Sequence, residues 1–207
     1  MIDCQGCKKE AGASRNCAWC AKWRENGFVA LGGQRAYEQF TQDGFKPSKV
    51  TYDALQAAKT FDPIRENLYF HGPTGTGKSH LAAAAARAFL PAVITVNPQE
   101  LISKMLAAGR QGDEWNVTRS YSMSKVLVID EMGLGEMTTL QATKLYLVLN
   151  RRYQDRSGGL IVTSNLSLED LATAIGDDRL PSRLAQMCKG RIYNFAGEPD
   201  HRLGDSK

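Results

Sequence analysis

The chain has 207 residues, of which 43% are hydrophobic, and carries a formal net charge of +4. This length and composition suffice for one core domain with a small appendage. No apolar run approaches the ~18 residues that a transmembrane helix needs, and the first residues lack the apolar stretch of a signal peptide. We therefore expect a cytoplasmic protein with no membrane partner. The mild positive charge permits a nucleic-acid partner without requiring one.

The chain divides by composition into a cysteine-bearing segment, 1–27, a linker with one helix, 28–60, and a larger domain, 61–207. Glycines and a proline interrupt the linker before its helix. In chain order, the predicted elements are a helix at about 48–59, a strand at 67–71, a helix at 78–90, a strand at 92–96, a helix at 98–109, a strand at 125–130, a helix at 138–156, a strand at 159–165, helices near 167–175 and 178–188, and a strand at 191–195. This alternation predicts an α/β fold, with helices on both faces of a parallel sheet.

The stretch GPTGTGKS, residues 72–79, lies between a predicted strand and a predicted helix. It fits the pattern GxxxxGK[ST], whose glycines let backbone N–H groups surround phosphate oxygens at the start of the helix. Lys78 would reach the β- and γ-phosphates, and the Ser79 hydroxyl can bind Mg²⁺. The loop therefore predicts a site for ATP and Mg²⁺. The residues predicted to contact the nucleotide here are Gly72, Pro73, Thr74, Gly75, Thr76, Gly77, Lys78, Ser79 and His80.

Two carboxylates, Asp130 and Glu131, follow the buried run VLVI. In an enzyme with a phosphate-binding loop, Asp130 would hold Mg²⁺ through water. Glu131 is placed to orient and deprotonate an attacking water molecule. Because a kinase must exclude that water, Glu131 favours an ATPase, which converts ATP and water to ADP and phosphate.

Polar residues also end the apolar run LIVTSN, residues 160–165. If this strand lies beside the other two, Ser164 or Asn165 would point a hydroxyl or an amide at the γ-phosphate or the water. Farther along the chain, Arg179 and Arg183 lie four residues apart on one face of a predicted helix. They form either a solvated basic face or a group that reaches the nucleotide of a neighbouring subunit.

The order GPTGTGKSHLA, VLVIDE, LIVTSN, RLPSRL and GEPDHR, over about residues 60–202, resembles the AAA+ ATPases of the DnaC/IstB group. This group comprises bacterial and phage helicase loaders and transposition helper ATPases. The resemblance implies a P-loop NTPase fold with an αβα core and a five-stranded parallel sheet. In that sheet, the strand leading to Asn165 would lie between the two nucleotide-binding strands. Because the chain continues only to Lys207, the helical lid would be minimal.

The resemblance also implies roles for single residues. Asn165 corresponds to sensor 1, and Arg202 corresponds to the sensor 2 arginine that contacts the nucleotide. Arg183 corresponds to the arginine finger that acts in trans, with Arg179 as its rival. A finger acting in trans implies a homo-oligomer, which we expect to be weak or conditional on DNA or a partner.

A pair of helices between the second and third strands touches single-stranded DNA in replication initiators and loaders of this clade. Residues 97–124 occupy the corresponding place in this chain. They include Lys104, Arg110 and Arg119, which are either contacts to single-stranded DNA or ordinary solvated charges.

Cys4, Cys7, Cys17 and Cys20 form two CxxC pairs near the start of the chain. Four thiolates in two such pairs suit tetrahedral Zn²⁺, and the metal would supply much of the folding free energy of so short a segment. Disulfides are disfavoured in a reducing cytosol, and an iron–sulfur cluster is the other alternative. We therefore predict a small structural zinc knuckle. Cys188 stands apart and suits a buried small side chain.

Together these features predict a DNA replication ATPase, a helicase loader that engages a replicative DNA helicase and single-stranded DNA. The zinc knuckle, with Trp19 and Trp23, would provide the docking surface for the helicase. Two alternatives remain. An IstB-like transposition helper would bind duplex DNA and a transposase, and an adaptor would bind ATP as a switch without hydrolysing it.

Overall fold

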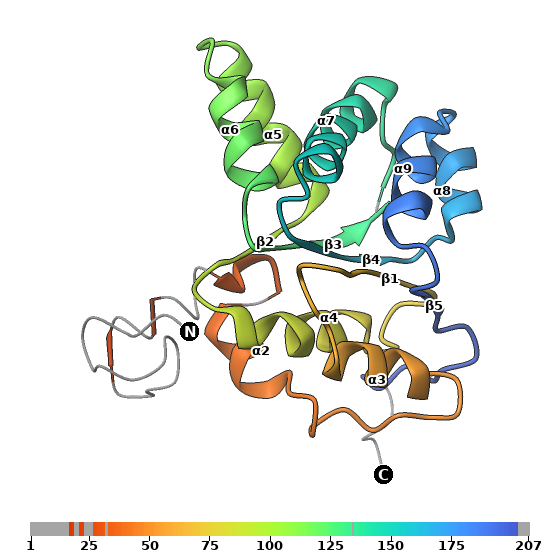
Figure 1. Ribbon diagram of the computed structural model, residues 1–207. Helices are drawn as coiled ribbons and strands as arrows, with labels where there is room; N and C mark the ends of the chain where they lie inside the picture. Colours follow the sequence, from red (N-terminus) through yellow and green to blue (C-terminus); the bar gives the residue numbers. More distant parts are fainter. Residues whose placement is uncertain (1–16, 19–20, 23–26, 32, 134, 203–207) are drawn as a thin grey trace.

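The computed structural model describes residues 17–18, 21–22, 27–31, 33–133 and 135–202. Five parallel strands form one sheet in the order β2-β3-β4-β1-β5 (Figure 1). Their bounds are β1 Asn67–His71, β2 Val93–Val96, β3 Val126–Met132, β4 Gly159–Ser164 and β5 Ile192–Asn194. The predicted α/β fold is confirmed, and β4 lies between β3 and β1, as the resemblance implied.

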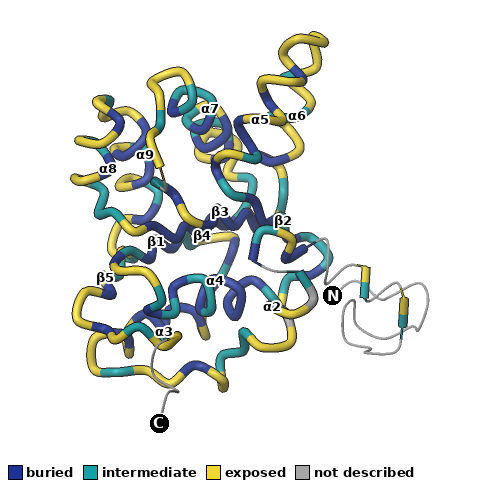
Figure 2. The backbone as a smooth tube through the Cα atoms, turned by 180° about the vertical axis from the view of Figure 1, so that it is seen from behind, coloured by how far each residue is buried: buried dark blue, intermediate teal, exposed yellow. Residues whose placement is uncertain are grey.

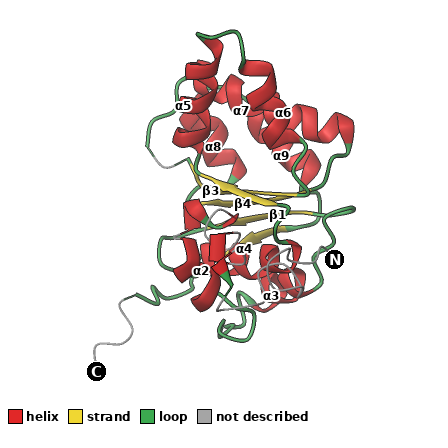
Figure 3. Ribbon diagram, turned by 90° about the vertical axis from the view of Figure 1, so that its left-hand side faces the viewer, coloured by secondary structure: helices red, strands yellow, loops and turns green. Residues whose placement is uncertain are grey.

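Helices cover both faces of the sheet and give the molecule three layers (Figure 3). One face carries α5 to α9, and the other carries α2 to α4 (Figure 1). The helices are α2 Gly33–Gln39, α3 Tyr52–Lys59, α4 Lys78–Ala86, α5 Pro98–Gly109, α6 Glu114–Ser122, α7 Thr139–Asp155, α8 Leu168–Ile175 and α9 Arg179–Met187, with short 3-10 turns at Val29–Leu31 and Arg87–Phe89. Among the described residues, no helix has both the length and the apolar character needed to cross a bilayer.

Alternate residues of the central strands face opposite layers, so the core has two halves. In β3, Val126 and Val128 pack on the side of α4, whereas Leu127 and Ile129 pack on the side of α5 and α7. Figure 2 shows these strands as a buried band between exposed outer surfaces. This alternation is the period of two that an extended chain imposes on its side chains.

Residues 28–60, predicted as a linker, contribute side chains to the core on the side of α4. Phe28, Ala36, Phe45 and Leu55 are all buried there. The reason lies in α4, whose residues from Leu81 to Ala86 are all buried. A helix that is apolar on every side has to be covered on every side, and its small alanines leave room for the large side chains of 28–60.

Among the α-helices of the described residues, α2 and α6 were not in the predicted list of elements. The α6 sequence EWNVTRSYS is rich in weak helix formers and buries only Tyr121 and Ser122, so it shows no clear helical period. The predicted helix 48–59 begins later, at Tyr52, after a turn in which Ser48 N–H donates to the Thr51 hydroxyl. These differences leave the arrangement of the sheet unchanged.

Candidate functional site

The loop from Gly72 to Gly77 joins β1 to α4 at the carboxyl edge of the sheet. Its glycines have positive φ angles, 135° at Gly72, 81° at Gly75 and 91° at Gly77, a region that glycine enters without steric cost. Gly77 is the N-cap of α4, so the loop ends at the N-terminus of that helix. Free backbone N–H groups and the helix dipole both attract a phosphate to this position.

Lys78, the first residue of α4, folds back over this loop. Its ammonium donates hydrogen bonds to the carbonyl oxygens of Gly72, at 2.7 Å, and Pro73, at 2.6 Å. Burial lowers the pKa of Lys78 to about 8; the Asp130 carboxylate opposes this shift and the charge of Arg202 adds to it. The structure thus holds the ammonium at the phosphate-binding loop, with Arg202 near enough to act on it.

Three side chains meet where α4, β3 and β4 come together. Asp130 Oδ1 accepts hydrogen bonds from Ser79 Oγ, at 2.8 Å, and from Thr163 Oγ1, at 2.5 Å. Burial raises the pKa of Asp130, and the two hydroxyl donors oppose that shift. Mg²⁺ prefers oxygen ligands and keeps several waters, so the adjoining Ser79 hydroxyl and Asp130 carboxylate fit this ion. Thr163 was not predicted as a site residue, because its role depends on a partner that lies 33 residues away in the sequence.

Glu131 owes its position to an irregularity in β3. The strand pairs Ile129 with Val162 and Met132 with Ser164, so β3 contains one extra residue between these two pairs. Glu131 lies in this bulge with a φ of 60°, and its N–H donates to Thr163 Oγ1 at 2.9 Å. A bulge turns a side chain away from the alternation of its strand. The carboxylate therefore projects exposed into the cleft beside the phosphate-binding loop.

At the end of β4 lie Ser164 and Asn165, the two residues that the sequence left as alternatives, and their surroundings differ. Ser164 is fully buried, and its hydroxyl donates to the carbonyl of Met132 at 2.6 Å, so it has a structural partner. Asn165, one residue later, is exposed and lines the same cleft as Lys78 and Glu131. Both residues line the cleft, and Asn165 is the exposed one of the two.

The cleft has a volume of about 550 Å³ and gathers segments from across the chain. Besides the loop, β3 and β4, two further segments line it, and of their residues only Arg202 had been predicted to contact the nucleotide. They are residues 40–46, which contribute Phe40, Gly44, Phe45 and Lys46, and residues 199–202, which contribute Pro199, Asp200, His201 and Arg202. No local signal in the sequence marks the first segment, because it reaches the loop only through tertiary packing.

Hydrogen bonds hold the segment 198–202 near both of its ends. His201 N–H donates to the carbonyl of Gly75 at 3.1 Å, and the buried Glu198 accepts a hydrogen bond from the Ser48 hydroxyl. His201 Nε2 also contacts Glu198 Oε1 at 3.1 Å. These contacts bring Arg202 to the rim of the cleft, on the described segment 195–202, which contains no helix.

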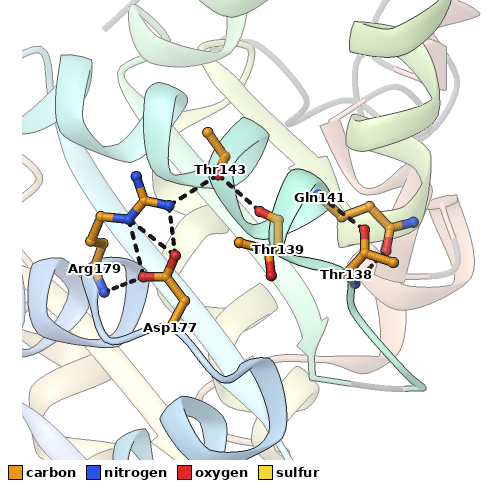
Figure 4. A network of polar contacts seen from close by, with 6 residues as sticks. All are labelled: Thr138, Thr139, Gln141, Thr143, Asp177 and Arg179. Atoms are coloured by element: carbon orange, nitrogen blue, oxygen red, sulfur yellow. Dashed lines mark hydrogen bonds and ion pairs between the residues drawn. The ribbon is translucent and has the colours of Figure 1, made fainter.

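The structure places Arg179 and Arg183 outside this cleft, on α9, where they contact α7. Arg179 makes a two-pronged ion pair with Asp177 and donates to Thr143 at 3.3 Å (Figure 4). Arg183 stacks over the ring of Tyr153, 4.4 Å from its centroid, and donates to Gln186. Neither residue is among the described residues that line this cleft in its own chain.

The predicted zinc ligands Cys4, Cys7 and Cys20, and the tryptophans of that segment, lie outside the described residues. The fourth, Cys17, is partly buried. Within the part of the chain that the structure describes, no group of three histidine, cysteine or acidic side chains is arranged to hold a metal. Cys188 is buried, as predicted, and burial raises the pKa of its thiol to about 12.

The three candidate DNA contacts lie on the α5–α6 pair and the turn between these helices. Lys104 pairs with Glu100 at 2.5 Å, and Arg110 is the C-cap of α5. Arg119 lies over the ring of Trp115, which is 56% exposed. Exposed aromatic and cationic groups thus share this surface.

Comparison with known proteins identifies a family that this chain matches. Residues 35–189 match the family of IstB-like ATP-binding proteins. A protein of insertion sequence IS5376 from Geobacillus stearothermophilus, named as ATP-binding, is 31% identical over 155 residues, which are 72% of this chain and 60% of the relative. The replicative helicase loader DnaC of Escherichia coli K12 is 28% identical over 130 residues, 60% of this chain and 52% of that protein. The chain thus spans little more than half the length of these relatives.

Solved structures share the fold. A crystal structure of the DnaC helicase loader superposes with a TM-score of 0.65 at 22% identity, covering 78% of this chain and 99% of that one. DnaA from Aquifex aeolicus, bound to AMPPCP, superposes with a TM-score of 0.61 at 18% identity, covering 75% of this chain and 50% of that one. The match over residues 35–189, on a fold that presents Lys78 and Ser79 at one cleft and joins Ser79 to Asp130 by a hydrogen bond, shows that this chain belongs to the family of IstB-like ATP-binding proteins.

Proposed function

We propose that this chain hydrolyses ATP and uses the cycle to load a replicative DNA helicase onto single-stranded DNA. The observation that best supports the proposal of hydrolysis is the geometry around Thr163. This hydroxyl donates to Asp130 and accepts from the backbone N–H of Glu131, so one side chain supports both the carboxylate proposed to bind Mg²⁺ and the residue proposed to orient the water. A protein that only bound ATP would not need the second carboxylate in the cleft.

Binding begins at the loop. The N–H groups at the start of α4 and the ammonium of Lys78 would hold the β- and γ-phosphates. Ser79 and Asp130 would hold Mg²⁺, which neutralises negative charge on the phosphates when it is bound. Arg202, at the rim of the cleft and close to Lys78, would add a second positive charge.

Hydrolysis needs one positioned water. Glu131 would orient this water and take its proton as the oxygen attacks the γ-phosphorus, while the bond to the ADP oxygen breaks. Asn165 would donate an amide hydrogen bond to the water or the γ-phosphate. Arg183 of a neighbouring subunit would stabilise the charge that develops on the transferred phosphoryl group, as arginine fingers do.

The test is phosphate release from Mg·ATP, with nucleotide binding measured separately by calorimetry. We expect Lys78→Ala to lose binding, because the phosphates lose their main point charge. Glu131→Gln should retain binding and lose about 10²- to 10⁴-fold in turnover, the usual contribution of a general base. Wild-type turnover in Glu131→Gln would rule out the role of that carboxylate and would leave the ATP-switch adaptor as the better description.

The helicase partner and single-stranded DNA are proposed from the similarity to DnaC, whose name describes a replicative helicase loader. The second candidate, a transposition helper, is favoured by the family match and by the higher identity to the insertion-sequence relative. DNA preference separates them. A loader should bind single strands more tightly than duplex in the presence of ATP, and a helper should show the reverse.

The cysteine-bearing segment would determine which partner protein the chain binds. We propose that Cys4, Cys7, Cys17 and Cys20 bind one Zn²⁺ and that residues 1–60 bind the helicase. Deleting residues 1–27 should abolish capture of a purified replicative helicase and leave basal ATPase activity nearly unchanged. Elemental analysis of protein purified without chelator should find one zinc per chain, and its absence would remove this part of the proposal.

A further inference from the structure

The imidazole of His80 connects the phosphate-binding loop to a segment far away in the sequence. His80 follows Ser79 in the first turn of α4. Its Nε2 contacts the carbonyl oxygen of Thr41 at 2.7 Å, across 39 residues of sequence. A carbonyl can only accept a hydrogen bond, so this ring nitrogen carries the proton and donates it.

Aromatic contacts hold the same ring from two sides. The His80 ring stacks on Phe40, with centroids 5.0 Å apart and an angle of 27°, and meets Phe45 edge-on at 5.4 Å. Phe45 in turn lies on the phosphate-binding loop, because a Cβ on Gly77 would be 2.6 Å from its ring. The hydrogen bond and the two ring contacts therefore fix Phe40 and Phe45 relative to the loop.

Phe40, Phe45 and His80 all line the nucleotide cleft, and the His80 ring also holds both phenylalanine rings. The N-terminus of α4 takes the phosphates, so an aromatic wall outside it suits the nucleoside end of the ligand, because aromatic side chains stack on bases. We propose that His80 is a positioning residue: it fixes residues 40–46 as the wall of the cleft that contacts the nucleoside. This inference rests on the proposed nucleotide site and does not depend on hydrolysis.

Two ligands test it, Mg·ADP and inorganic pyrophosphate, with affinities measured by calorimetry on the full chain. We expect His80→Ala to weaken ADP binding about tenfold, the combined effect of one hydrogen bond and two ring contacts. Pyrophosphate has no nucleoside, so its affinity should stay within about twofold of the wild type. At saturating ATP the kcat should be retained while KM rises in parallel with the Kd for ADP.

His80→Gln provides the rescue, because the amide nitrogen of glutamine can replace Nε2 as the donor to Thr41. It should recover most of the ADP affinity. Trp115→Ala, on α6, removes an exposed aromatic residue away from the cleft and serves as the matched control. The proposal is overturned if His80→Ala binds ADP like the wild type, if ADP and pyrophosphate weaken equally, or if glutamine fails to recover binding. Failure of ATP hydrolysis in the wild type would contradict the proposed function and leave this comparison intact.

Discussion

The carboxylate of Asp200 lies against the backbone of Gly75, so closely that a Cβ on this glycine would be 1.9 Å from Asp200 Oδ1. Gly75 also has a φ of 81°, and its carbonyl accepts the N–H of His201. The C-terminal segment is therefore packed on the phosphate-binding loop through its backbone and through a negative charge. A carboxylate at this place opposes the charge of any phosphate that the loop binds.

The first prediction concerns that charge. Asp200→Asn keeps the shape of the side chain and removes the repulsion, which is worth about 1 kcal/mol for unit charges about 4 Å apart when they are fully solvated. We expect the Kd for Mg·ADP to fall about fivefold, measured by calorimetry at low salt. Glu169→Gln, an exposed acid on α8, is the matched control. Unchanged or weaker binding in Asp200→Asn would show that the carboxylate does not oppose the nucleotide.

The second prediction concerns Thr163. Thr163→Val keeps the branched shape and removes the hydroxyl that joins Asp130 to the backbone of Glu131. Because both carboxylates lose their common support, we expect turnover to fall about tenfold or more, with a smaller change in nucleotide affinity. Losing the hydrogen bond to the buried carboxylate should lower the free energy of unfolding by about 1–3 kcal/mol. Thr163→Ser restores the hydroxyl and should recover turnover, and its failure to do so would count against this role.

The third prediction concerns assembly. Arg183→Ala subunits retain a complete loop, and Lys78→Ala subunits retain Arg183. If the arginine acts in trans, neither variant should hydrolyse ATP well alone, and mixing them should restore activity. Arg179→Ala is the control on the same helix, because its guanidinium is held within the chain by Asp177.

The readout is phosphate release as a function of protein concentration, with and without single-stranded DNA. Activity per chain should rise with concentration in the wild type. A flat profile together with wild-type activity in Arg183→Ala would describe a self-contained monomer instead.

The fourth prediction concerns the thiol of Cys188. Burial raises its pKa from the ordinary value of 9.0 to about 12, so the reactive thiolate is scarce in the folded protein below that pH. Iodoacetamide at pH 8.5 should therefore leave Cys188 unmodified in the native state and alkylate it rapidly in denaturant. Mass spectrometry of the peptide that contains Cys188 separates it from the N-terminal cysteines. Rapid native alkylation would mean that the region around α9 opens readily.

Much of this protein follows from its sequence alone, because the signals are local. The apolar run before Asp130 predicts a buried strand, and the spacing of Gly72, Gly77 and Lys78 predicts the phosphate-binding loop that follows β1. Pro98 and Gly109 are the first and last residues of α5, as predicted, because proline suits the first turn of a helix and glycine is common where a helix ends. Neighbouring residues specify these features, so they can be read without knowing the fold.

Other features were decided only by the tertiary structure. Glu131 faces the cleft because β3 bulges against β4, and the aromatic wall of Phe40 and Phe45 exists because His80 meets Thr41 across 39 residues. Asp200 reaches Gly75 only because the chain returns past β5 to the loop. No local pattern encodes such contacts, since they depend on which distant segments the packed core brings together. The sequence thus determines the chemical groups of the site, and the packing of its layers determines where these groups meet.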